Sequence, residues 1–174
     1  MVTKLLPLHF VIGFCIVLIA SSLVGTFGCK KQEQQGWKEE GNPAIDSTAL
    51  DEHLAEAWSS IQSGDKGKAA TVLEQSYLMK PIFPSQWLTR AKIALELNKP
   101  ELALNDAKQL VRLDSSAGEG YQLIVLSCSQ IRDPSDVNLE IALSSVRTVT
   151  KSFPQLTGHP EWSSAVDRLR ERGH

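Results

Sequence analysis

The sequence has few of the residues on which catalysis and metal binding usually depend. Its 174 residues include four histidines and three cysteines, and neither a His-x-x-x-His nor a Cys-x-x-Cys spacing occurs. It also has no glycine-rich phosphate loop and no Gly-x-Ser-x-Gly nucleophile turn. The sequence therefore predicts a protein that is not an enzyme and uses no cofactor or metal ion. A catalytic group assembled only in space is the weaker alternative.

The chain also lacks a strong excess of charge of either sign. It has 18 Lys and Arg against 20 Asp and Glu, for a net charge of −2, without the clustered basic face that nucleic-acid binding requires. Aromatic residues are sparse at 6%, whereas hydrophobic residues reach 42% with many Ala and Leu. This composition predicts an all-α fold and argues against a nucleic-acid partner.

The N-terminal segment, from Met1 to Cys29, has the organisation of an export signal. Lys4 precedes an apolar stretch from about residue 5 to 24, and Gly28 and Cys29 stand before an abruptly polar segment. With Cys29 at this boundary, the segment resembles a bacterial lipoprotein signal, although Thr26 and Phe27 replace its usual Leu and small residue. The resemblance implies diacylglycerol on the Cys29 thiol. Two alternatives remain, an uncleaved anchor of the ~20 residues that span a bilayer and secretion after ordinary cleavage.

The residues after Cys29 predict a tether and a location. Residues 30–46 are rich in Gln, Glu and Lys with Gly and Pro, which predicts a flexible polar tether. Lys30 stands where an inner-membrane retention signal in some bacteria has Asp. We therefore expect a domain anchored in the bacterial cell envelope, with the outer membrane slightly favoured where there are two. The remaining thiol, Cys128, is predicted to be buried and inert.

From residue 47 onward, apolar residues recur at the spacing of α-helices. Gly64, Pro81 and Pro154 are typical helix terminators, and Pro84 and Pro100 suit first turns. The predicted helices span about 47–64, 66–80, 84–98, 100–115, 117–131, 136–153 and 160–171. We expect the seventh to cap the apolar face of the preceding helices.

Two segments of the helical region match at a fixed offset. Ala69 corresponds to Ala103, and each helix pair ends twelve residues later, at Pro81 and at Ser115. Ala142 is likewise followed twelve residues later by Pro154. In this third unit the loop between the two helices, which precedes Ala142, is longer by about five residues. The predicted units cover about 50–83, 84–117 and 118–156. The step from Ala69 to Ala103 equals the period of the tetratricopeptide repeat, which is about 34 residues.

The chain resembles tetratricopeptide repeat proteins at these positions. Bulky residues stand early in the second and third units, and small ones stand where paired helices cross. The residues assigned to this packing are Ala57, Ala69, Trp87, Ala91, Ala103, Tyr121, Val125 and Ala142. The resemblance implies a short superhelix of three helix pairs followed by a C-terminal capping helix.

The same resemblance implies a concave groove, lined by the first helix of each pair, that binds another protein. The groove residues it points to are Leu54, Trp58, Ile61, Leu88, Lys92, Leu95, Gln122, Leu126 and Ser129. An apolar groove with one lysine favours an amphipathic helix or an extended apolar peptide. The alternative is that these side chains pack against neighbouring helices. The predicted function is a membrane-tethered adaptor or assembly factor, or alternatively a non-catalytic accessory subunit of an envelope enzyme complex.

Overall fold

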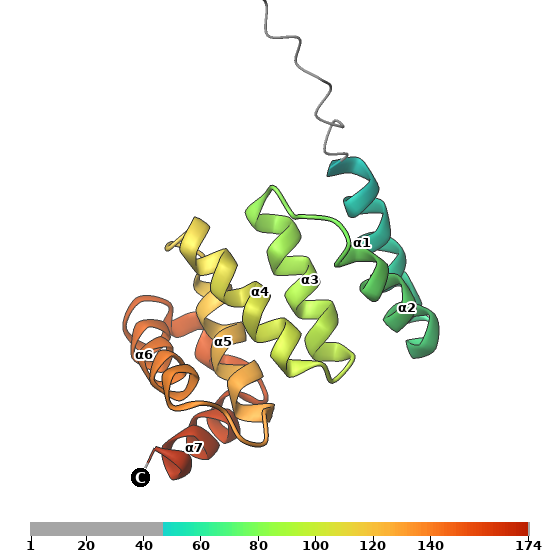
Figure 1. Ribbon diagram of the computed structural model, residues 1–174. Helices are drawn as coiled ribbons and strands as arrows, with labels where there is room; N and C mark the ends of the chain where they lie inside the picture. Colours follow the sequence, from blue (N-terminus) through green and yellow to red (C-terminus); the bar gives the residue numbers. More distant parts are fainter. Residues whose placement is uncertain (1–46, 174) are drawn as a thin grey trace, which may run out of the picture. The chain divides into compact units, whose positions relative to one another are not determined.

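Seven α-helices form in residues 47–173, the part of the chain that the computed structural model describes (Figure 1). They are α1 (Ser47–Gln62), α2 (Lys66–Ser76), α3 (Pro84–Glu96), α4 (Pro100–Leu113), α5 (Gly118–Gln130), α6 (Asp136–Ser152) and α7 (Trp162–Arg172). No strand occurs between residues 47 and 173. The predicted all-α fold is thus confirmed. The predicted signal, Cys29 and the tether lie outside the described residues.

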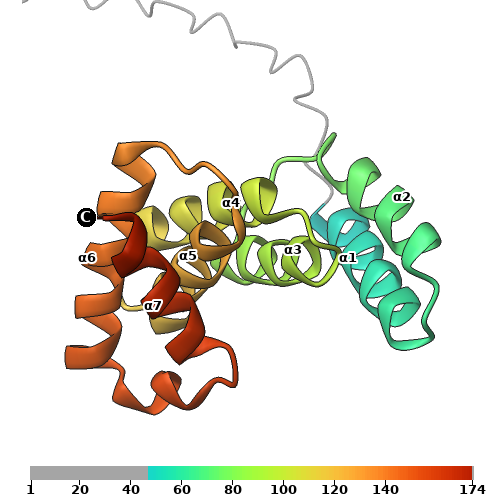
Figure 2. The same ribbon diagram turned by 90° about the horizontal axis from the view of Figure 1, so that it is seen from below.

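Consecutive helices pack as pairs, α1 with α2, α3 with α4 and α5 with α6 (Figures 1 and 2). The first helices of neighbouring pairs are also in contact, and α7 packs against α5 and α6. One core cluster is formed mainly by the first two pairs and includes Leu50, Leu73 and Ile93. A second cluster around Ile124 and Leu169 joins α3 and α4 to α5, α6 and α7. Each pair therefore covers the apolar face left open by the one before it.

The first two hairpin turns have the same backbone structure, one repeat period apart. Gly64 and Asn98 both adopt positive φ, 83° and 55°. In the first turn the Asp65 amide donates to the Ser60 carbonyl at 2.9 Å, and in the second the Lys99 amide donates to the Ala94 carbonyl at 2.8 Å. These bonds satisfy carbonyls at a helix end that would otherwise lack a partner. The offset seen in the sequence therefore recurs in the backbone.

A buried ion pair connects α3 to α4. The Arg90 side chain is 4% exposed and that of Asp106 is 3% exposed. Arg90 Nε donates to Asp106 Oδ2 at 2.8 Å, and Nη2 donates to Oδ1 at 2.9 Å, a two-pronged contact. The Tyr77 hydroxyl donates to Oδ2 at 2.9 Å. Every oxygen of the carboxylate thus has a partner, as a buried charge requires.

The same guanidinium reaches back to the end of α2. Arg90 Nη1 donates to the carbonyls of Ser76 and Met79, at 3.1 and 3.3 Å. Its Cζ lies 4.1 Å from the centroid of the Tyr77 ring and 5.0 Å from that of Trp87. We call these groups the Arg90–Asp106 cluster. It joins the first helix pair to the second.

This cluster explains why α2 ends at Ser76 and not near residue 80 as predicted. The amides of Tyr77, Leu78 and Met79 bond to carbonyls three residues back, so the chain turns more tightly than an α-helix. This turn presents two carbonyls to Arg90. The sequence prediction placed the helix end at Pro81 because the proline was the visible terminator.

The segment before α7 also differs from the prediction. A short 3-10 helix, Pro154–Gly158, follows α6, and α7 begins at Trp162 rather than near residue 160. The link packs against the start of α5, where the rings of Tyr121 and Phe153 stack with centroids 6.3 Å apart. A Cβ on Gly118 would lie 2.7 Å from the Phe153 ring, so glycine permits this approach. Helical periodicity alone does not predict this 3-10 helix or its packing against α5.

We expect Asp106→Ala to destabilise the fold strongly, because it leaves the Arg90 guanidinium and the Tyr77 hydroxyl buried without their acceptor. Breaking a buried pair from one side typically costs about 3–5 kcal/mol. Urea denaturation followed by circular dichroism measures the loss. Glu56→Ala is the control, since its 2.9 Å contact with Lys68 is exposed and should leave the midpoint unchanged. Equal midpoints for the two variants would contradict the central role of the cluster.

The cluster also predicts a dependence of stability on alkaline pH. Burial, and then the Asp106 carboxylate, raise the pKa of Tyr77 above its usual ~10. A raised pKa in the folded state contributes stability that is complete below pH ~10 and is lost as pH rises through the folded value. The free energy of unfolding should therefore fall more steeply above about pH 10 in the wild type than in Tyr77→Phe. Parallel curves for the two proteins would contradict this assignment.

Candidate binding surface

A hollow of about 260 Å³ opens between α1 and α3, on the face predicted to bind a partner. On α1, residues spaced by three, four and seven positions point to one side, and α3 contributes two residues four apart. The lining residues are Asp51, Leu54, Ala55, Trp58, Ser85 and Thr89. The interior is mostly apolar, with hydroxyl and carboxylate groups among the lining side chains. The geometry suits one large apolar side chain held within a polar border.

Two of the predicted groove residues define this hollow. Leu54 is 3% exposed and belongs to the core beneath, so it contributes only an edge. Trp58 is partly exposed and packs against the same core, which fixes its ring while leaving one side open. Trp58 is thus the larger accessible apolar group of the pair. Ile61, one turn further along α1, is also partly buried against this core.

A second hollow of about 310 Å³ lies between the end of α3, the end of α5 and the segment that precedes α7. It is lined by Leu95, Glu96, Asn98, Gln130, His159 and Glu161. Leu95 is a predicted groove residue, and Leu88 lies partly exposed two turns before it on α3. Most of the lining is polar. This part of the surface therefore fits the polar side of a bound segment better than its apolar side.

The predicted lysine of the groove is not a lone cation. Lys92 Nζ lies 2.8 Å from Glu119 Oε1, and both side chains are more than a third exposed. The contact links α3 to α5 across the predicted groove. Because the two charges compensate each other, this surface offers a neutral polar pair rather than an anion site.

The third unit corrects the predicted groove, because its part of the face is covered. Leu126 is 2% exposed and lies in the core cluster that contains Trp162 of α7. Gln122 Nε2 donates to the Leu156 carbonyl at 2.8 Å, and Arg168 Nη2 donates to Ser129 Oγ at 3.2 Å. The predicted groove therefore stays open along α1 and α3, whereas Gln122, Leu126 and Ser129 of α5 are covered or bonded by the segment before α7 and by α7 itself.

Arg172 holds the covering helix in place. Its Nη1 donates to the carbonyls of Ile131, Ser129 and Cys128, at 2.8, 3.3 and 3.5 Å. These carbonyls belong to the last turn of α5 and the residue that follows it, where a helix lacks internal donors and favours a positive charge. Ile131 is extended, with φ −68° and ψ 130°, so the chain makes no left-handed turn here. The arginine therefore satisfies groups that the turn itself leaves open.

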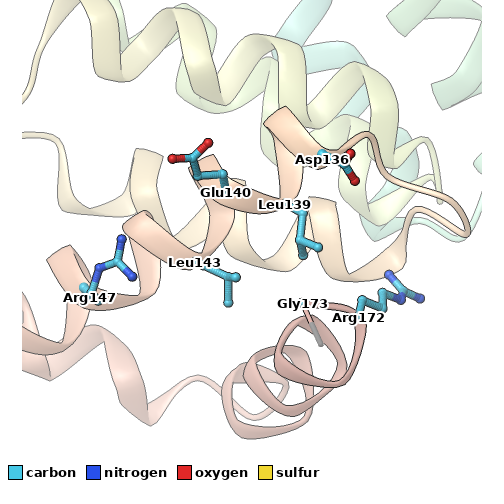
Figure 3. A pocket seen from close by; sticks show the side chains of 7 residues that line it. All are labelled: Asp136, Leu139, Glu140, Leu143, Arg147, Arg172 and Gly173. Atoms are coloured by element: carbon cyan, nitrogen blue, oxygen red, sulfur yellow. The ribbon is translucent and has the colours of Figure 1, made fainter.

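A larger hollow, of about 540 Å³, lies between α6 and the end of α7 (Figure 3). Asp136, Leu139, Glu140, Leu143 and Arg147 come from one side of α6, and Arg172 and Gly173 come from the end of α7. The charges are of both signs, and Arg172 is already bonded to α5. This hollow is an open seam beside the last helix pair and has no converging set of polar groups.

The residues assigned to repeat packing lie at helix contacts. Trp87 and Tyr121 are partly buried, the first beside Arg90 and the second against Phe153. The fully buried members are Ala57, Ala69, Ala91, Ala103, Val125 and Ala142. These small side chains let the paired helices approach closely.

The described part of the chain offers no candidate metal site. No cluster of three or more His, Cys, Asp or Glu residues able to hold a metal ion occurs among those residues. Cys128 is fully buried, its Sγ lies 3.6 Å from the Asn138 carbonyl, and burial raises the pKa of its thiol. None of the helices in residues 47–173 is both long and apolar enough to span a bilayer.

No protein-family model, curated protein sequence or solved structure matches this chain.

Proposed function

We propose that this chain is a tetratricopeptide-like interaction module, tethered to a bacterial membrane through Cys29, that acts as an adaptor or assembly factor in the cell envelope. The observation that carries the proposal is the apolar hollow beside Trp58, between the first helices of two neighbouring pairs. The turn geometry that recurs after one repeat period supports the repeat assignment. The signal-like segment that ends at Cys29 supports the tether.

The geometry of the open surface favours an amphipathic helix as the bound segment. Its apolar side fits the hollow lined by Trp58, whereas its polar side meets the Lys92–Glu119 pair and the polar hollow beyond. Aromatic residues in a pocket with a polar border are the usual centres of binding energy at protein interfaces. We therefore place the bound segment over α1, α3 and the adjoining part of α5, in place of a groove along all three units.

A bulky charge in the hollow should weaken binding without disturbing the core. Thr89 lines the hollow and is partly exposed, so Thr89→Arg places a guanidinium where the apolar side chain of the partner would enter. For helical peptides selected from a display library, we expect the dissociation constant to rise about tenfold or more. Isothermal titration calorimetry measures it. Thr71→Arg on the exposed side of α2 is the matched control and should bind as the wild type does.

Two results would count against the binding site. Peptides that bind wild type and Thr89→Arg equally would place the site elsewhere. A display experiment that yields no peptide sensitive to Thr89→Arg or Trp58→Ala would remove the interaction site from the proposal.

The tether has its own test. Mass spectrometry of the chain purified from membranes should show residue 29 as the first residue, carrying the mass of a diacylglycerol group. The Cys29→Ala chain should lack this mass. An intact residue 1 without any acyl mass would contradict lipid attachment and favour the uncleaved anchor.

A further inference from the structure

The exposed large apolar side chains of residues 47–173 gather mostly at one end of the helical array. Leu78, Ile82 and Phe83 are 88%, 44% and 51% exposed and lie in the link between α2 and α3. Leu113, at the end of α4, is 59% exposed. The fifth, Val137, lies at the start of α6. Apolar surface gathered in this way marks a contact with another molecule or a membrane.

The first four side chains share the end of the array at which α1 begins, which we call the proximal end. Because paired helices are antiparallel, the start of α1, the 77–83 link and the end of α4 all lie there, as Figure 1 shows. A direct bond supports this placement, since Gln86 Nε2 donates to Asp51 Oδ1 at 3.0 Å. The loop between α5 and α6, which precedes Val137, lies at the opposite end.

The apolar link is held in shape from inside. Gln86 is 1% exposed, and its Oε1 accepts from the amides of Ile82 and Phe83 at 2.8 and 3.2 Å. Pro81 is buried, whereas Leu78, Ile82 and Phe83 face outward around it. A fixed backbone that presents three apolar side chains to solvent exposes them at no gain to the fold. Their exposure therefore points to a partner at the proximal end.

We infer that the proximal end rests on the lipid bilayer, with Leu78, Ile82, Phe83 and Leu113 inserted into its interfacial layer. The inference rests on the proposed tether, because residue 47 at the proximal end is joined to Cys29 by 18 peptide steps (47 − 29). A chain of that length spans at most about 60 Å, so the proximal end cannot move further than this from the membrane that holds Cys29. Side chains of this kind bind at the boundary between headgroups and acyl chains.

Because the proximal end has charges of both signs, we expect most of the membrane-binding energy to come from insertion of the apolar side chains. The exposed cations Lys80 and Arg112 lie next to the apolar side chains and suit lipid headgroups. The carboxylates Asp51, Glu52 and Asp114 lie at the same end. Because both signs are present, we expect the contact to withstand high salt, unlike the binding of a basic patch.

The test places an environment-sensitive dye on a cysteine introduced at Leu78→Cys or, as the matched control, at Val137→Cys. The full chain, purified from membranes, is reconstituted into phosphatidylethanolamine and phosphatidylglycerol vesicles, and flotation verifies its attachment. We expect blue-shifted, brighter emission and quenching by brominated lipid for the dye at residue 78. The dye at residue 137 should report water. The parent chain without an added cysteine provides the background.

A second variant tests the contact without moving the dye. In the Leu78→Cys chain, Phe83→Glu should shift the emission back toward that in water, whereas about 1 M NaCl should leave it unchanged.

The outcomes separate the inference from the proposed function. A chain that floats with the vesicles while both dyes report water would overturn the inference and leave the tether standing. A chain that does not float would overturn the tether and the inference together. Emission at residue 78 that rises with the number of chains per vesicle, at constant lipid, would assign the surface to a second copy of the chain and contradict the inference.

Discussion

The ion pair between Arg90 and Asp106 determines how the first helix pair joins the second. One guanidinium binds the Asp106 carboxylate on α4, two carbonyls at and beyond the end of α2 and the face of the Tyr77 ring. A buried pair stabilises a fold only where its own polar atoms are satisfied, and here each guanidinium nitrogen of Arg90 and both carboxylate oxygens of Asp106 have partners, whereas Nε1 of the neighbouring Trp87 has none. It also sets the residue at which α2 ends. The position of the apolar link that follows, and therefore of Leu78, depends on it.

The sequence predicted the helices and the small residues between them because both follow from periodicity. Prolines and Gly64 gave most of the boundaries to within a few residues. The Arg90–Asp106 cluster was missed, although a signal was present. Arg90 stands among inward-facing residues of α3, and Asp106 lies between Ala103 and Ala107 on α4. Two opposite charges on apolar faces indicate a buried pair, but only the hairpin geometry shows that they meet.

The open part of the candidate surface could be predicted only in part, for a similar reason. The pattern of α7 identifies its apolar side but not the helix that this side covers. That choice depends on the widened loop after α5, which has no residue in the left-handed conformation. In the first two pairs, backbone amides satisfy the carbonyls of Ser60 and Ala94. Cys128 occupies the equivalent place in the third pair, and there Arg172 donates instead. The loop after α5 therefore leaves carbonyls that Arg172 of α7 satisfies, and α7 in turn covers the apolar face of the third pair.

The shortened surface and the proximal end are related by the direction of the helices. Both α1 and α3 begin at the proximal end, and the hollow is lined by residues from the first three turns of α1 and the first two of α3. A domain resting on the bilayer by this end would therefore open its apolar hollow close to the membrane. A partner segment just outside its own membrane anchor would reach Trp58 without a long linker. The Lys92–Glu119 pair and the covered third unit lie on the α5 side of the hollow, and they would limit the length of a bound segment in that direction.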